Sequence, residues 1–333
     1  MALRTNSNIA DPENGDSVMA TCTQCKQRDA VYMRVYSGEK LCSKCFTKSI
    51  EDKVKITIAK YKMFKPDDKI AVAVSGGKDS ITLLHIMTKF EKLFPKASLC
   101  AVTIDEGIQG YRDEAVRLAS EYCQSHGIEH FITSFKDLFN VQLDDLVLLL
   151  KQKVNTSNGA LSPCAYCGVL RRRALNIVAR QAKADKLALA HNLDDEVQTI
   201  LLNIMHGDAP RIARVKPVLE ATHPMFVPRV KPICEVPEKE IAFYAYLRKT
   251  EFQSTPCPYA PTAMRNDIRQ MLNRIEERHA GTKYTIFRSV EKIRPALEAT
   301  EKETILHACK VCGEPTVGEI CKPCELLQKV GVK

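Results

Sequence analysis

The first 20 residues of this sequence lack an apolar stretch long enough for a signal peptide or a membrane-spanning helix. Polar residues, Pro12 and Gly15 fill this segment instead. We therefore expect a disordered N-terminus over residues 1–17 and a cytoplasmic protein without a membrane partner. The Walker pattern, GxxxxGK followed by Ser or Thr, is also missing. Its absence disfavours phosphoryl transfer by a P-loop NTPase.

Size and charge indicate a protein with more than one folding unit and an anionic partner. The chain has 333 residues, 45% of them hydrophobic, whereas single domains usually have ~100–200 residues. Its 49 Lys and Arg residues outnumber 40 Asp and Glu residues, which gives a net charge of +9. This charge favours a polyanion such as nucleic acid, although ordinary soluble enzymes carry similar charges.

Cysteine is the most informative residue type in the chain. Fourteen cysteines in a reducing compartment indicate metal or redox chemistry rather than disulfides. Ten of them form five CxxC pairs, and four of these pairs lie near the chain ends. Two pairs can supply four thiolates to a tetrahedral zinc ion, and segments this small cannot fold without metal. We predict two zinc ribbons, over residues 18–47 and 306–333, with two zinc ions bound by Cys22, Cys25, Cys42, Cys45 and by Cys309, Cys312, Cys321, Cys324.

Between the ribbons, strand-like and helix-like segments alternate, which predicts an α/β fold with a doubly wound parallel sheet. The expected strands are 31–36 in the first ribbon and 70–74, 99–104, 128–133 and 187–190 in the core. The expected core helices are 79–90 and 113–125. We assign 48–66 to a linking helix, 67–257 to a catalytic domain and 258–305 to a helical segment, and we expect 206–237 to be an irregular surface segment.

Residues 75–80 lie where the first core strand gives way to a helix, and open α/β sheets bind their ligands at this edge. Gly76 and Gly77 let the backbone approach oxygen atoms closely, the helix start presents N–H groups, and Lys78 adds positive charge. A plain strand-to-helix turn with a serine cap would account for only one glycine and one serine. We therefore interpret this segment as a phosphate-binding loop.

The sequence SGGKDS after an apolar strand resembles the PP-loop of ATP pyrophosphatases, which split ATP into AMP and pyrophosphate. The resemblance implies that ATP, accompanied by Mg²⁺, is a co-substrate and that Lys78 takes part in catalysis. The residues that it implies for ATP binding are Ser75, Gly76, Gly77, Lys78, Asp79, Ser80, Ile104, Arg171 and Ala190.

The fifth CxxC pair, Cys164 and Cys167, lies inside the core, and Cys257 follows later between two prolines. Three core thiols flanked by terminal ribbons resemble the tRNA 2-thiouridine synthetases of the TtuA and NcsA type, from about Cys22 to Cys324. In that family the three positions hold a 4Fe–4S cluster, and three ligands for four irons leave one iron open for an external sulfide. A third zinc site and a redox pair that cycles through a persulfide are the alternatives.

A second polar loop, AHNLDDE at residues 190–196, closes the fourth core strand. Its carboxylates suit Mg²⁺ binding or proton transfer, and the resemblance implies that Asp195 is a catalytic acid or base. Helix capping is the alternative for Asp194 and Asp195, because carboxylates offset the macrodipole at a helix start. We interpret His191 as structural.

Basic residues follow the core CxxC pair. The resemblance implies a nucleotide contact and a place in the catalytic set for Arg171, although an arginine stays charged and is a poor proton carrier. Zinc ribbons that grip folded RNA by shape and phosphate contacts favour tRNA as the partner. A solvated basic face is the alternative. The candidate tRNA contacts are Arg172, Arg173, Arg211 and Arg214.

The resemblance implies 2-thiolation of a tRNA uridine: ATP adenylates uracil O2, and a sulfide then displaces AMP. We expect the wobble uridine to be the target, with a T-loop uridine as the alternative. The sulfur donor is either a ubiquitin-like carrier or free sulfide, and we expect a homodimer. The alternative functions are a cytidine 2-thiolase and a non-catalytic zinc-ribbon tRNA-binding protein. An amidating synthetase is disfavoured because no glutaminase segment is present.

Overall fold

The structure, a computed structural model, describes residues 20–153, 162–260, 264–299 and 305–332. The N-terminus that we predict to be disordered, residues 1–17, lies outside the described residues. The chain divides into two compact units, Met1–Ser49 and Ile50–Lys333. Within the described residues, no helix combines the length and the apolarity that crossing a membrane requires.

The N-terminal unit is a small hairpin that leads into a helix. Strand β1 (Tyr32–Arg34) pairs antiparallel with β2 (Glu39–Leu41). The expected strand 31–36 is shorter in the structure, because the chain turns back directly after Arg34. Helix α1 (Ser43–Lys60) begins ahead of the expected residue 48, so Cys45 lies in its first turn.

A six-stranded sheet with the order β5-β4-β3-β6-β8-β7 forms the centre of the second unit. All neighbouring strands pair in parallel except β7, which is antiparallel to β8. The strands are β3 (Lys69–Ala73), β4 (Ser98–Asp105), β5 (Glu129–Ser134), β6 (Lys186–Ala188), β7 (Val218–Leu219) and β8 (Arg229–Val230). The predicted doubly wound sheet is confirmed. Its strand order reverses at β3, and such a switch point is where open sheets bind ligands.

The interpretation of residues 206–237 as an irregular surface segment is wrong. This stretch contains α8 (Ala209–Ala213), β7 and β8, and β8 extends the sheet by pairing with β6. Val230, Ile233 and Val236 are fully buried. The two strands have two residues each, which is too short for an alternating pattern to appear in the sequence.

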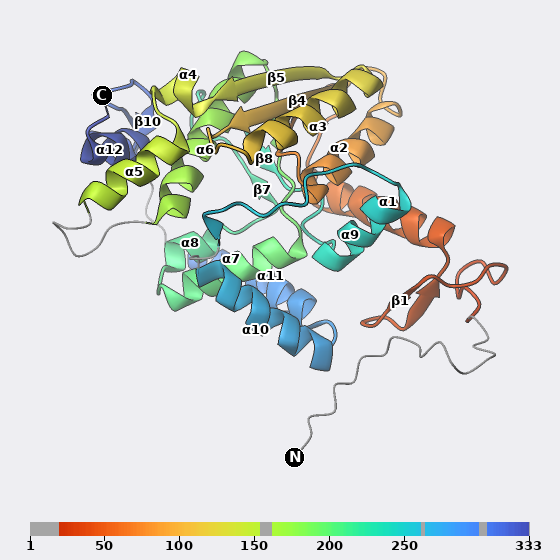
Figure 1. Ribbon diagram of the computed structural model, residues 1–333. Coiled ribbons are helices and arrows are strands. Elements are labelled where there is room, and N and C mark those ends of the chain that lie inside the picture. Colours follow the sequence, from red (N-terminus) through yellow and green to blue (C-terminus); the bar gives the residue numbers. More distant parts are fainter. Residues whose placement is uncertain (1–19, 154–161, 261–263, 300–304, 333) are drawn as a thin grey trace. The chain divides into compact units, whose positions relative to one another are not determined.

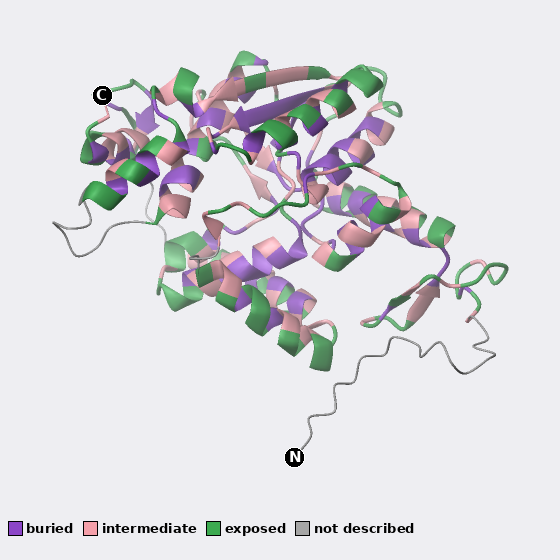
Figure 2. Ribbon diagram, viewed as in Figure 1, coloured by how far each residue is buried: buried purple, intermediate pink, exposed green. Residues whose placement is uncertain are grey.

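Helices cover both faces of the sheet. Ala71 and Val102 pack in one core with Leu170 of α6 (Pro163–Gln181), so α6 covers this face. Successive strand residues point to opposite faces, and α2 (Lys78–Glu91) and α3 (Arg112–His126), which contact β3, β4 and β5, contribute no residue to that core. Figure 2 shows β4 as a buried strand between these layers.

The remaining helices pack around the sheet, with α9 against α2 and α4 against α6 and β5. The predicted helical character after Pro261 is confirmed in the described residues, where two helices pack against α7 and α8. The C-terminal ribbon places its helix α12 against α5 and α6 (Figure 1). The helices and strands not yet given bounds are α4 (Phe135–Phe139), α5 (Leu143–Lys153), α7 (Leu193–Met205), α9 (Glu238–Leu247), α10 (Met264–Arg278), α11 (Thr282–Glu298), β9 (His307–Ala308), β10 (Pro315–Thr316) and α12 (Lys322–Val330).

Candidate active site and metal centres

The phosphate loop connects the end of β3 to the start of α2. Gly76 has a left-handed φ of +81°, and a Cβ at this position would lie 2.5 Å from the backbone oxygen of Ala115, so only glycine fits. Gly77 caps α2, and a Cβ there would meet only Ser75 Oγ at 3.7 Å. Ser80 Oγ holds the loop by accepting from Ser75 N at 3.1 Å and donating to the Gly77 carbonyl at 2.9 Å. No side-chain hydrogen bond caps the described start of α2 at Gly77, and a helix start of this kind favours an anion.

Lys78 lies between two carboxylates of this site. Its Nζ is 2.9 Å from Asp79 Oδ2 and 2.7 Å from Glu238 Oε1. Burial alone lowers the pKa of Lys78, but the charges of Asp79 and Glu238 outweigh it and the pKa is raised, so the lysine stays cationic. Glu238 also contacts Arg269 at 2.5 Å. Sequence reasoning missed Glu238, because it lies at the start of α9 with no motif around it.

Asp195 combines a capping role with a shifted pKa. Asp195 N donates to Asn192 Oδ1 at 3.0 Å, and Asn192 N donates to Asp195 Oδ2 at 3.1 Å, which forms a capping box at the start of α7. Burial and then the nearby charge of Asp79 raise the pKa of Asp195 to about 7. A carboxyl group with this pKa can exchange a proton near neutral pH. Asp194, in contrast, is buried in an ion pair with Lys283 of α11.

Three further residues of this region lie around the carboxyl ends of β4 and β6, the strands that flank β3. Ile104 at the end of β4 is buried, and Ala190, just past β6, is half-buried. The next residue, His191, has solvent-exposed surface, but many protein atoms lie around its ring. Burial is the main cause that lowers the pKa of His191 to about 3, and the positive charges of Lys231 and Arg265 are the next causes. The ring is therefore neutral.

The core cysteines lie on two segments of the chain that contact each other. Cys164 and Cys167 lie in the first turns of α6, and Cys164 Sγ donates to the Tyr259 carbonyl at 3.4 Å, two residues beyond Cys257. The segment before Cys257 is tied to the phosphate loop, because Gln253 N donates to Gly76 O at 2.9 Å. Burial raises the pKa of Cys167 to about 11, with smaller contributions from its neighbours.

The spacing of these core thiols differs from that of the terminal cysteines. Among the described residues, the groups whose ligand atoms all lie within 4.8 Å of one another are the two terminal sets of four cysteines, and Cys164, Cys167 and Cys257 do not form such a group. A single zinc ion needs its thiolates close together, whereas ligands of separate irons in a cluster stand further apart. The wider spacing therefore fits a cluster better than a third zinc ion.

Arg171 lies between the core cysteines and the end of β4. Its guanidinium donates to Cys167 Sγ at 3.1 Å, and its Nε is 2.6 Å from Glu106 Oε1. The charge of buried Glu106 raises the pKa of Arg171 above its ordinary value. Sequence reasoning missed Glu106. The available signal was its position just past the expected strand 99–104, at the edge of the sheet where ligands bind.

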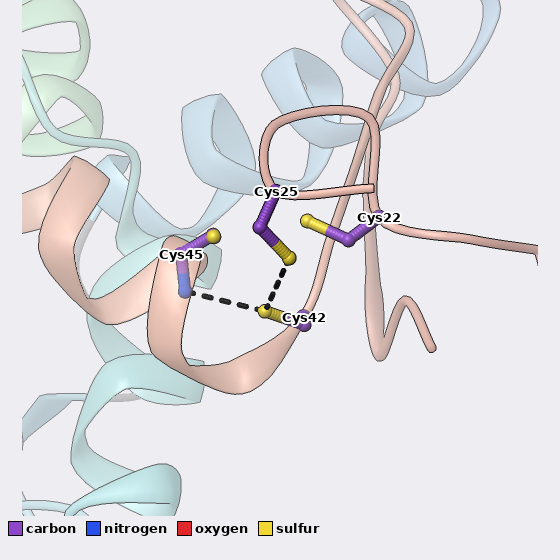
Figure 3. Close-up of side chains that lie close together, drawn as sticks. All are labelled: Cys22, Cys25, Cys42 and Cys45. Carbon is purple, nitrogen blue, oxygen red and sulfur yellow. Dashed lines mark hydrogen bonds between the residues drawn. The ribbon is translucent and has the colours of Figure 1, made fainter. Parts of the chain in front are cut away.

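The N-terminal cysteines form a compact set from the turn before β1, the end of β2 and the first turn of α1. Figure 3 shows the sulfurs of Cys22, Cys25, Cys42 and Cys45 gathered around a common centre, and all lie within 4.8 Å of one another. Cys25 and Cys42 Sγ are 3.9 Å apart, close to the ~3.8 Å between thiolates of a tetrahedral zinc with bonds of ~2.3 Å. Burial raises the pKa of Cys22, but backbone N–H groups outweigh it and lower the pKa to about 6. The donor set therefore fits zinc.

The C-terminal cysteines repeat this arrangement. Cys309, Cys312, Cys321 and Cys324 lie within 4.8 Å of one another, with 3.5 Å between Cys312 and Cys321 Sγ. Backbone N–H groups, the first of them from Cys321, outweigh burial and lower the pKa of Cys309 to about 6. Zinc binds the thiolate form of cysteine, so backbone N–H groups that stabilise this form prepare Cys309 to bind zinc.

The four candidate tRNA contacts have different surroundings. Arg172 is exposed, whereas the side chain of Arg173 is 12% exposed, lies 2.9 Å from Glu314 Oε2 and donates to Cys312 Sγ at 3.4 Å. Arg211 is exposed beside Asp208 at 3.1 Å, and Arg214 at the end of α8 is exposed. Arg173 therefore contacts the C-terminal ribbon, and the other three arginines are accessible.

Comparison with known sequences identifies the family. The PP-loop domain family matches residues 46–276. The tRNA 2-thiolation protein NcsA of Haloferax volcanii is 36% identical over 329 residues, and the match covers 93% of this chain and 98% of that protein. The cytoplasmic tRNA 2-thiolation protein 1 of Chlamydomonas reinhardtii is also 36% identical, and the match covers 92% of this chain and 84% of that protein.

Comparison with solved structures identifies the same family. The U34-tRNA thiolase NcsA from Methanococcus maripaludis, solved with its 4Fe–4S cluster, matches this chain with a TM-score of 0.80 at 34% identity. The match covers 95% of this chain and 98% of that structure. The chain therefore belongs to the PP-loop family, and within it to the NcsA-type tRNA 2-thiolation proteins.

Proposed function

We propose that this chain catalyses the ATP-dependent 2-thiolation of a uridine in tRNA, with the wobble uridine as its target. One observation carries the proposal: the segment that leads to Cys257 is hydrogen-bonded to the phosphate loop. Gln253 N donates to Gly76 O at 2.9 Å, and Cys257 follows four residues later. The names of the relatives, a tRNA 2-thiolation protein and a U34-tRNA thiolase, support the substrate and the position.

The first step is the adenylation of the base. Uracil O2 attacks the α-phosphorus of ATP, pyrophosphate leaves, and the N3 proton passes to the carboxylate of Asp195. The N–H groups at the start of α2 and Lys78 stabilise the phosphate charge, which requires Lys78 to exchange Glu238 for a phosphate oxygen. Asp79, a carboxylate of the phosphate loop itself, would hold Mg²⁺. The uracil oxygen then leaves as part of AMP, a far better leaving group.

The second step is sulfur transfer. A sulfide attacks C2 of the adenylated base, the bond between C2 and O2 breaks, and AMP carries the oxygen away. When bound through Cys164, Cys167 and Cys257, a 4Fe–4S cluster supplies one iron without a protein ligand, at which an external sulfide can bind. The wide spacing of the three thiols supports this cofactor, and Arg171 directs an N–H group at one of the ligand sulfurs.

The remaining parts of the proposal are the zinc ions, the tRNA contacts, the sulfur donor and the oligomeric state. Each ribbon binds one zinc ion, and Arg172, Arg211 and Arg214 contact tRNA phosphates. The sulfur donor is a ubiquitin-like carrier or free sulfide, and the active form is a homodimer in the cytoplasm. The connection of Asp195 to Asp79 of the phosphate loop through Asn192 supports an enzyme over a non-catalytic tRNA-binding protein.

Mass spectrometry of tRNA tests the target directly. We expect tRNA from cells that lack the chain to lose 2-thiouridine at the wobble position, and expression of the wild-type chain to restore it. Loss confined to the T loop would contradict the position. Unchanged 2-thiouridine at every position would contradict the function.

A further inference from the structure

A buried carboxylate links two arginines at the carboxyl end of β4. Glu106 follows the last residue of this strand, and its side chain is 3% exposed. Its Oε1 lies 2.6 Å from Arg171 Nε, and its Oε2 lies 2.7 Å from Arg112 Nε. The second contact is a close ion pair without the alignment of a hydrogen bond. A carboxylate removed from water needs such charged partners, and Glu106 has one on each oxygen.

The two arginines extend from Glu106 into different parts of the site. Arg112 donates to the Ser75 carbonyl at 2.9 Å, at the first residue of the phosphate loop, and also to the Ile104 carbonyl. Arg171 donates to Cys167 Sγ at 3.1 Å. A continuous chain of charged contacts therefore runs from the phosphate loop through Glu106 to a core cysteine.

A purely structural role for Glu106 accounts for only half of this arrangement. Arg112 is as buried as Glu106, with 5% of its side chain exposed, so a carboxylate is needed to neutralise it. Arg171 keeps 45% of its side chain exposed and would remain charged without Glu106, because an arginine does not lose its proton in proteins. Its contact with Glu106 restricts a long, mobile side chain to a single direction, toward the Cys167 sulfur.

We propose that Glu106 is a positioning residue for both halves of the reaction: it fixes Arg171 against the cluster ligand Cys167 and Arg112 against the phosphate loop. This inference rests on the proposed function of the site. A hydrogen bond to a ligand sulfur stabilises a cluster and raises its reduction potential. Loss of the Glu106 charge releases Arg171, which removes that hydrogen bond, and leaves Arg112 as an uncompensated buried charge behind the phosphate loop.

The test compares the full-length chain, loaded with the cluster under anaerobic conditions, with its Glu106→Gln variant. We expect the variant to lose iron to a chelator roughly 10–100-fold faster, the usual effect of losing an outer partner of a metal ligand. We expect its reduction potential to shift to a more negative value. In cluster-free protein, ATP should bind more weakly, because Arg112 no longer holds the Ser75 carbonyl.

Two further variants separate positioning from folding. Glu121→Gln, which removes an exposed ion pair with Arg117 on α3, should leave iron loss, potential and ATP affinity unchanged. Arg171→Ala should reproduce the cluster effects of Glu106→Gln, and the double variant should show no additional cluster effect. Glu106→Asp keeps the charge and should show intermediate values.

The proposal is overturned if a folded Glu106→Gln chain keeps the wild-type iron loss and potential while Arg171→Ala changes them. It is also overturned if Glu106→Gln fails to fold and Glu106→Asp behaves as wild type, since the role is then structural. A wild-type chain that holds a cluster but transfers no sulfur to tRNA contradicts the proposed function instead. A wild-type chain that takes up no iron contradicts both.

Discussion

Asn192 joins the two loops of the active site, because its Nδ2 donates a hydrogen bond to Asp79 Oδ1 over 3.1 Å. Its Oδ1 accepts from Asp195 N at 3.0 Å, so one amide contacts both the phosphate loop and the proposed proton acceptor. Carboxylates held near each other disfavour each other's ionised form. Asp79 is accordingly the second cause, after burial, of the raised pKa of Asp195.

The rate of adenylation should depend on the ionisation of Asp195. Its pKa is about 7 and only the carboxylate accepts a proton, so kcat/KM for tRNA-dependent pyrophosphate release should rise as the pH increases through about 7. Asp79→Asn removes the second cause of the shift and should move this rise to lower pH, even where the maximal rate falls. An Asp195→Asn variant with the same pH profile as wild type would exclude Asp195 as the base.

The same shift predicts the pH dependence of stability. An acid with a raised pKa in the folded state contributes stability that is fully present below its unfolded value of 3.8 and is lost as the pH rises through about 7. Asp195→Asn should therefore increase the Tm above about pH 7 and have much less effect in acid. Thermal unfolding at several pH values measures this, and an equal change at every pH would contradict it.

The two glycines of the phosphate loop should respond differently to alanine. Gly76→Ala places a Cβ 2.5 Å from the Ala115 oxygen at a φ of +81°, so it should destabilise the fold by ~1–3 kcal/mol or more. Gly77→Ala has room and should fold as wild type. If the phosphates of ATP approach this helix start, Gly77→Ala should weaken ATP binding roughly tenfold, as expected for one disturbed charged hydrogen bond. Unchanged ATP affinity in this folded variant would place the phosphates elsewhere.

Loss of zinc should have different consequences at the two ends of the chain. The N-terminal ribbon belongs to its own compact unit, whereas α12 of the C-terminal ribbon buries Leu326 and Val330 in the core that contains α6. Metal analysis should give about two zinc ions for wild type and about one for Cys42→Ser or Cys321→Ser. Only Cys321→Ser should also lower the Tm of the core and accelerate iron loss, because α6 carries Cys164 and Cys167. Equal effects of both variants on the core would contradict this asymmetry.

Neighbouring arginines of α6 offer a matched test of tRNA binding. Arg172 is exposed, while Arg173 is held by Glu314 at 2.9 Å. Arg172→Ala should weaken tRNA binding and reduce the slope of log Kd against log salt by about 1. Arg173→Ala should leave that slope unchanged and lower the Tm through the ribbon. If both variants change the salt slope equally, Arg173 also reaches the RNA.

Local sequence signals were sufficient for the core strands β3, β4, β5 and β6 and for the motifs. The buried strand 70–74 with SGGKDS after it located the phosphate loop at the switch point, and the CxxC spacing located both cysteine sets, because these signals depend on neighbours in the chain. Glu238 was missed because its partner lies far away in sequence: Lys78 is 160 residues from Glu238. Glu106 was missed because no motif marks it and one of its partners, Arg171, lies on a distant helix. The strands β7 and β8 were missed because two residues carry no periodic pattern.

The most direct test of the central claim is an anaerobic assay of sulfur transfer to tRNA with ATP and sulfide, comparing cluster-loaded chain, iron-free chain and Cys257→Ala. We expect 2-thiouridine, AMP and pyrophosphate in equal amounts from the cluster-loaded chain alone. The other two proteins should still bind ATP, because the phosphate loop is built from separate residues. Full sulfur transfer by rigorously iron-free protein would contradict the account.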